Sequence, residues 1–70
     1  MTMTPYAFHE ARRKLGLTQK QAARLLGYGA APRISEIERG ERQPSEAVVR
    51  LLRAYLDGYR PEDWPDKTDD

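Results

Sequence analysis

The sequence contains no cysteine and one histidine among its 70 residues, and each scarcity excludes a kind of site. Without cysteine no disulfide framework can form, and His9 alone cannot build a zinc cluster. No apolar run reaches the length of a membrane span or of a signal peptide. We therefore expect no metal, no cofactor and no membrane contact, and we expect a cytoplasmic protein.

Side chains suited to catalysis are equally scarce. The acidic residues fall in surface or tail positions, so no carboxylate pair is set on an apolar pocket. His9 next to Glu10 is typical of a solvated pair rather than of a general base. The glycines stand at predicted helix ends and form no phosphate-cradling cluster. We therefore expect no catalytic residue and no enzyme activity.

The charge is small in sum but uneven along the chain. The formal net charge is +1. Residues 12–42 carry eight basic and three acidic side chains, a local charge of +5, whereas residues 59–70 carry two basic and five acidic side chains, a local charge of −3. A basic body of this kind is typical of a protein that binds phosphates.

Start and stop signals divide the chain into four helical segments. Each begins at a hydroxyl cap or with a proline in its first turn, and each ends at a glycine. The predicted helices are 5–15, 19–26, 31–39 and 46–57. No strand pattern competes with them. We expect an all-α, compact four-helix domain over residues 1–58 and an acidic tail without regular structure over residues 59–70.

Apolar spacing predicts the core and a contact between two chains. The expected buried residues of the first three helices are Tyr6, Phe8, Ala11, Leu15, Ala22, Ala23, Leu25, Leu26, Ile34 and Ile37. The apolar set of the last helix is wider than one stripe, which indicates cover on two sides, by its own core and by a partner chain. The predicted homodimer interface is Val49, Leu52, Tyr55, Leu56, Tyr59 and Trp64. For Trp64, the favoured interpretation is a packing residue that folds back on the body or onto a second subunit.

The two middle helices are short and joined by a tight turn, the arrangement that places one helix in the major groove of DNA. The motif residues are Leu17-Thr18-Gln19, Ala23, Leu26-Gly27 and Ile34-Ser35-x-x-Glu38-Arg39-Gly40, with Pro44 beyond. With these residues the chain resembles the lambda-repressor and Cro-type (XRE-like) helix-turn-helix family over residues 5–57, with the helix-turn-helix at residues 18–40. One departure is a turn of six residues between Gly27 and Ile34, where this family usually has five. The resemblance implies a regulator that binds double-stranded DNA.

Burial of Ile34 and Ile37 turns the opposite face of the third helix outward. The candidate base-contacting residues on this face or its flank are Arg33, Ser35, Glu36 and Ala31. Arg33 is the first choice, because its guanidinium can grip guanine O6 and N7 together. Glu36 can accept from cytosine N4, Ser35 can contact a base or a phosphate, and the Ala31 methyl can touch a thymine methyl.

Phosphate contacts are expected around the same helix. Gln19 stands at the start of the second helix, where free backbone amides point outward, and the resemblance implies a phosphate contact there. The other candidates flank the presumed groove or lie late in the third helix: Lys20, Tyr28, Arg39, Arg42 and Gln43. For Lys20, Tyr28 and Gln43 the alternative is an ordinary solvated surface position.

The resemblance assigns a structural role to Glu38. This residue follows the apolar Ile37 and is angled inward. In the family the equivalent acid pairs with an arginine of the first helix, and the matching position here is Arg12. The resemblance therefore implies a partly buried Arg12–Glu38 salt bridge that sets the first helix against the third.

Two functions from different classes are compatible with these features. The first is a dimeric transcriptional regulator, most simply an autorepressor of a phage, mobile-element or anti-CRISPR-type operon. Such a dimer would place two recognition helices about 34 Å apart on an inverted-repeat operator. With no sensor module, no small-molecule effector is expected. The second is an antitoxin or other protein-interaction module whose acidic tail, with Trp64 between Pro61 and Pro65, binds a partner protein.

Overall fold

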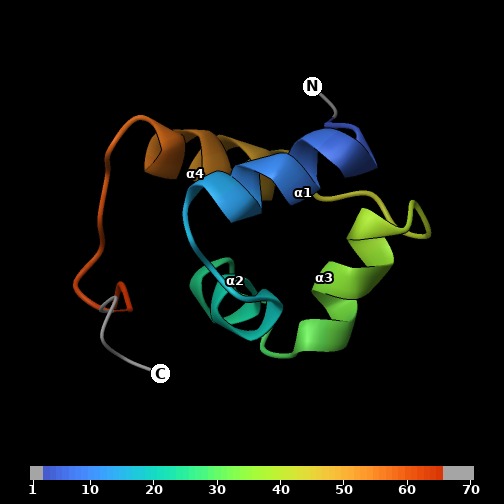
Figure 1. Ribbon diagram of the computed structural model, residues 1–70, viewed down its shortest axis with the longest axis horizontal. Helices are drawn as coiled ribbons and strands as arrows, with labels where there is room; N and C mark the ends of the chain where they lie inside the picture. The colour runs from blue at the N-terminus through green and yellow to red at the C-terminus, as the bar shows by residue number, and fades with distance from the viewer. Residues whose placement is uncertain (1–2, 66–70) are drawn as a thin grey trace.

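The computed structural model describes residues 3–65, which form four α-helices and no strand. The helices are α1 (Pro5–Lys14), α2 (Gln19–Leu25), α3 (Ala31–Glu38) and α4 (Glu46–Leu56). In Figure 1, α1 lies alongside α4, and α2 and α3 lie beneath them in the view. The predicted all-α, four-helix fold is confirmed. None of these helices is long and apolar enough to cross a membrane.

Local capping explains where α2 begins and ends. The Thr18 hydroxyl accepts from the Gln21 backbone N–H at 3.0 Å, and the Gln21 side chain accepts from the Thr18 N–H at 2.9 Å, which completes the predicted capping box. At the other end the Tyr28 N–H donates to the Ala23 carbonyl at 2.8 Å. Gly27 makes this closure possible because its φ of +85° lies in the left-handed region.

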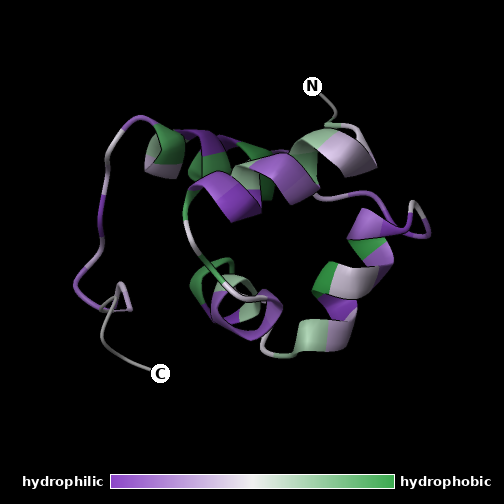
Figure 2. Cartoon of the chain, viewed as in Figure 1, coloured by the Kyte–Doolittle hydropathy of each residue, from purple (hydrophilic) through white to green (hydrophobic). Residues whose placement is uncertain are grey.

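The core lies between the helices and is built mainly as the spacing predicts. Hydrophobic and hydrophilic residues alternate along the helices in Figure 2 rather than forming continuous runs. The largest fully buried side chains are Phe8, Ile34, Ile37, Val49 and Leu52. The predicted burial of Ala11 and of the apolar positions of α2 is confirmed as well, whereas Leu15 is partly buried.

Tyr6 does not belong to the core, contrary to the prediction. Its side chain is 72% exposed, whereas Phe8 is 0% exposed. The reason is the helical period: residues two apart lie about 200° from each other around the axis, so Phe8 and Tyr6 face in nearly opposite directions. Ala11, three residues beyond Phe8, shares the buried side.

The predicted outer face of α4 is also corrected by the structure. Val49, Leu52 and Tyr55 are 0%, 1% and 3% exposed, so the core of the same chain covers them. Leu56 and Tyr59, at 42% and 54%, are the exposed members of that set. The wide apolar surface of α4 is therefore explained within one chain, and it is not evidence for a second one.

The segment after α4 supplies part of this cover. Tyr55 stacks with Tyr59 at 5.9 Å between ring centres and meets the edge of Trp64 at 5.0 Å. The Arg60 guanidinium lies 4.2 Å from the Trp64 ring centre and donates to the Tyr55 carbonyl at 2.7 Å. Residues 59–65 contain no helix, in keeping with the prediction, and the rest of the predicted tail, residues 66–70, lies outside the described residues. Trp64 packs against the body.

Candidate nucleic-acid interface

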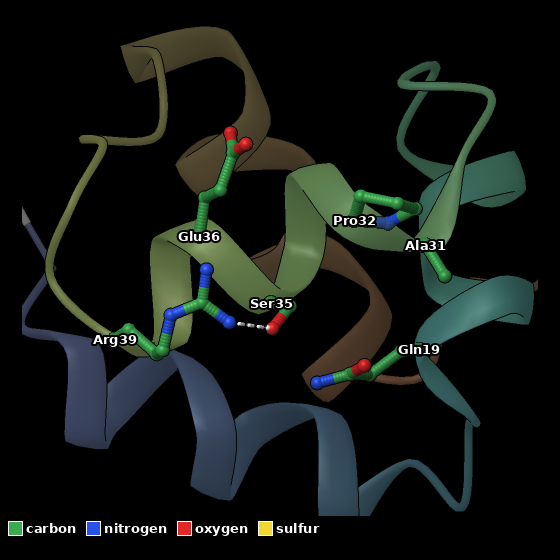
Figure 3. Close-up of a pocket in the computed structure, with 6 residues that line it drawn as sticks. All are labelled: Gln19, Ala31, Pro32, Ser35, Glu36 and Arg39. Carbon is green, nitrogen blue, oxygen red and sulfur yellow. Dashed lines mark hydrogen bonds between the residues drawn. The ribbon is translucent and has the colours of Figure 1, made fainter.

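The outward side of α3 forms a shallow hollow together with the first residue of α2. The residues that line it are Gln19, Ala31, Pro32, Ser35, Glu36 and Arg39. Figure 3 shows the α3 side chains on the surface of that helix and Gln19 reaching toward the same space from α2. This arrangement follows from the sequence, because Ile34 and Ile37 are fully buried and turn the opposite side of α3 to solvent.

The lower part of this surface is held together by Arg39. Its guanidinium donates to the Ser35 hydroxyl, drawn as the dashed line in Figure 3, and to Glu41 at 2.9 Å. Arg39 is exposed. Its hydrogen bond to Glu41 and its positive charge lower the pKa of the Glu41 carboxyl. Ser35 therefore presents a hydroxyl whose oxygen already accepts a charged hydrogen bond, which leaves its proton available to an acceptor.

Arg33 and Glu36 lie beside each other on the flank of the hollow. The Arg33 Nε lies 3.6 Å from Glu36 Oε1, and the Arg33 guanidinium carbon lies 5.6 Å from the centre of the Tyr28 ring. Arg42 reaches Glu36 Oε1 from the following loop at 3.0 Å. Of the residues predicted to touch bases, three therefore line the hollow, and Arg33 stands at its edge.

The predicted phosphate-contacting residues differ in their exposure. Lys20, Arg42 and Gln43 are exposed, Tyr28 is half-buried beside Arg33, and Gln19 is half-buried and lines the hollow. The Gln19 amide nitrogen already donates to Glu38 Oε1 at 3.2 Å. The side-chain carbonyl oxygen of Gln19 is thus the part of the amide group that remains for other partners.

Glu38 is the centre of a partly buried cluster beneath the hollow. Its carboxylate accepts from Arg12 Nε at 2.6 Å and Nη2 at 3.1 Å, and its side chain is 8% exposed. His9 Nδ1 lies 3.1 Å from the same carboxylate. Burial alone would raise the pKa of Glu38, but the hydrogen bonds from Arg12, His9 and Gln19 outweigh it and hold the pKa below its ordinary value.

This cluster contains the Arg12–Glu38 pair that the resemblance implies, and it adds a residue that sequence reasoning missed. His9 is paired with Glu38 of α3, not with its neighbour Glu10. The available signal was the spacing of His9 and Arg12, which puts both on one side of α1. Arg12 also donates to the Leu17 carbonyl at 2.9 Å, so the cluster ties α1 to the segment that leads into α2.

The turn before α3 contains the departure from the usual spacing. It holds a second glycine in the left-handed region, Gly29, with a φ of +83°. Its N–H shares the Ala23 carbonyl at 3.2 Å with Tyr28. Ala30 then stands at the N-cap position of α3, where no side chain caps the helix. The first turn of α3 therefore carries small apolar side chains, and no side chain caps its N-terminus.

Comparison with known proteins agrees with this geometry. Residues 8–64 match the helix-turn-helix family, which is most of the chain. The chain belongs to the helix-turn-helix family. The lambda-repressor and Cro-type resemblance is thereby confirmed, and the matched region extends through Trp64. As a helix-turn-helix protein it belongs to a family of DNA-binding regulators.

One curated relative of this helix-turn-helix chain is Antitoxin MqsA of Escherichia coli (strain K12). The two are 38% identical over 52 residues, which is 74% of this chain. The match spans 39% of the length of that protein.

Proposed function

We propose that this protein is a sequence-specific transcriptional regulator that reads the major groove of DNA with α3. The observation that carries the proposal is the solvent-facing surface of α3, lined jointly with Gln19 of α2, in a chain of the helix-turn-helix family. The major groove of DNA, about 12 Å wide, admits one α-helix. The face of α3 opposite the buried Ile34 and Ile37 is turned to solvent and is available for such a contact.

The proposed contacts divide into base readers and phosphate anchors. Arg33, Ser35, Glu36 and Ala31 face the bases. The phosphate anchors are Gln19, Lys20, Tyr28, Arg39, Arg42 and Gln43. Phosphate contacts fix the register of the protein on the duplex, and base contacts select the sequence.

We further propose that the regulator acts as a homodimeric repressor on an inverted repeat. Because the core covers Val49, Leu52 and Tyr55, the side chains available for a symmetric contact are Leu56 and Tyr59 at the end of α4. Sedimentation of the free protein tests this arrangement. A dimer that Leu56→Glu converts to a monomer supports it, and a monomer at micromolar concentration contradicts it.

DNA binding itself is tested by selection from a random duplex library, followed by fluorescence anisotropy with the enriched and scrambled duplexes. Arg33→Ala is expected to weaken binding to the enriched duplex by about 5- to 150-fold, the equivalent of about 1–3 kcal/mol for a bidentate base contact. The matched control is Arg53→Ala, which removes an exposed arginine of α4, outside the helix-turn-helix. An absence of any enriched sequence, or equal losses in the two variants, would contradict the proposal.

An antitoxin role is the second candidate, and the similarity to Antitoxin MqsA is what favours it. The test is titration of the purified protein with the product of each gene adjacent to its own, by calorimetry. Saturable binding that is lost when residues 59–70 are removed, with DNA binding retained, would support a partner-binding tail. No heat of binding to either neighbour would contradict it.

A further inference from the structure

Glu36 is the acidic residue that lines the hollow on α3. Its side chain is 34% exposed and projects from the helix on the side away from the Arg39–Ser35 pair, as Figure 3 shows. A carboxylate at this place is electrostatically costly for a surface that approaches phosphates, because like charges repel across the interface. A base contact by itself therefore does not explain why a carboxylate stands at this position.

The contacts of Glu36 show what the carboxylate does in the free protein. Arg42 Nε lies 3.0 Å from Oε1, and Arg33 Nε lies 3.6 Å from the same oxygen. Two arginines from the edge of the proposed DNA surface thus share one negative charge. Within residues 3–65, the hydrogen bond that Glu36 accepts, from Arg42, uses Oε1, so Oε2 accepts none there and can receive a donor from outside the chain.

We propose that Glu36 is a specificity-determining residue, which suppresses binding to arbitrary DNA and favours sites that present a cytosine amino group to Oε2. This inference rests on the proposed function. On arbitrary DNA, Glu36 holds Arg33 and Arg42 back from phosphates and repels the backbone. At a matching site, cytosine N4 donates to Oε2, and acceptors such as guanine O6 or thymine O4 at that place are rejected. Specificity then arises from a repulsive element as well as from an attractive one.

Glu36→Gln tests the proposal against a matched variant, Glu46→Gln. Both substitutions remove one negative charge. Glu36→Gln weakens the pairs with Arg33 and Arg42, and Glu46→Gln weakens the pair with Arg50, whose Nη2 lies 2.9 Å from Glu46 Oε2. Glu46 is exposed on α4, outside the helix-turn-helix. Anisotropy on the enriched and scrambled duplexes is measured across a salt series. For Glu36→Gln, scrambled DNA is expected to bind more tightly, with a salt slope steeper by about 1 for each arginine released to a phosphate. The ratio of the two Kd values is expected to fall by about 5- to 150-fold, whereas Glu46→Gln changes it less than twofold.

A second measurement uses the natural protein and changes only the DNA. Each cytosine of the enriched duplex is replaced in turn by 2-pyrimidinone, which lacks the N4 amino group. The wild-type protein is expected to lose at least about fivefold in affinity at one position, and Glu36→Ala, which removes the acceptor, is expected to be insensitive at that position.

The outcomes separate this inference from the proposed function. If the wild-type protein enriches no sequence, the proposed function fails and the inference fails with it. If it binds an enriched duplex selectively, but no 2-pyrimidinone position weakens binding or Glu36→Gln keeps the wild-type ratio, the inference alone is overturned. Equal effects of Glu36→Gln and Glu46→Gln would overturn it as well, because net charge and not position would then govern selectivity.

Discussion

Replacing Glu38 by alanine is expected to destabilise the fold by about 3 kcal/mol. The Glu38 side chain is 8% exposed and that of Arg12 is 13% exposed, so removing the carboxylate strands a largely buried guanidinium. Breaking a buried pair from one side costs roughly 3–5 kcal/mol. We take the lower end because Arg12 keeps its hydrogen bond to the Leu17 carbonyl, at 2.9 Å.

This loss is large for a small domain. A chain of 70 residues has a free energy of unfolding of roughly 4–10 kcal/mol, so about three quarters of it is at stake in the less stable case. The melting temperature is expected to fall by roughly 12–24 °C, because each kcal/mol shifts a domain of this size by about 4–8 °C. Urea unfolding followed by far-ultraviolet circular dichroism measures the change directly.

An exposed ion pair in the same chain provides the control. Arg50 and Glu46 of α4 lie 2.9 Å apart with side chains 78% and 57% exposed, so Glu46→Ala is expected to cost at most about 1 kcal/mol. The double variant Arg12→Met with Glu38→Leu is expected to recover much of the loss, since two apolar side chains leave no buried charge unpaired. If Glu38→Ala costs no more than Glu46→Ala, the argument from burial is refuted.

Two further predictions concern acid stability and the DNA sequence. Hydrogen bonds from Arg12, His9 and Gln19 overcome the effect of burial and lower the pKa of Glu38 below 4.5. The ionised Glu38 carboxylate therefore contributes fully to stability above the pKa of the unfolded chain, near 4.5. This contribution is lost as the pH falls through the lower pKa of the folded state. Urea unfolding between pH 6 and pH 3 is expected to show this decline in the wild-type protein and a smaller one in Glu38→Gln; parallel curves would contradict the assignment. In the enriched duplex, replacing each thymine by deoxyuridine removes the C5 methyl alone, and one position is expected to weaken binding about fourfold through lost contact with Ala31, the effect of one buried methyl group. Ala31→Gly should abolish that sensitivity, and a duplex insensitive at every thymine would rule out the contact.

The proposed interface was only partly accessible to sequence reasoning. The outward face of α3 follows from Ile34 and Ile37, because two buried residues three apart fix the rotation of a short helix. The pairing of Arg42 with Glu36 does not follow, since Arg42 belongs to the loop after α3 and the path of that loop depends on the packed body. His9 illustrates the same limit, for its partner Glu38 is 29 residues away.

The helices and their ends were determined by the sequence alone, because their signals are local. The Thr18–Gln21 capping box and the left-handed Gly27 lie at the two ends of α2 and act within a few residues of it. Each helix could therefore be placed along the chain without knowing which helices pack against it. The burial of Tyr55 required the tertiary structure. Its hydroxyl donates to the Leu25 carbonyl, 30 residues earlier, and Trp64 covers its ring from the segment after α4. An apolar stripe indicates that one face of a helix is buried. Whether the same chain or a second one buries it depends on contacts between residues far apart in the sequence.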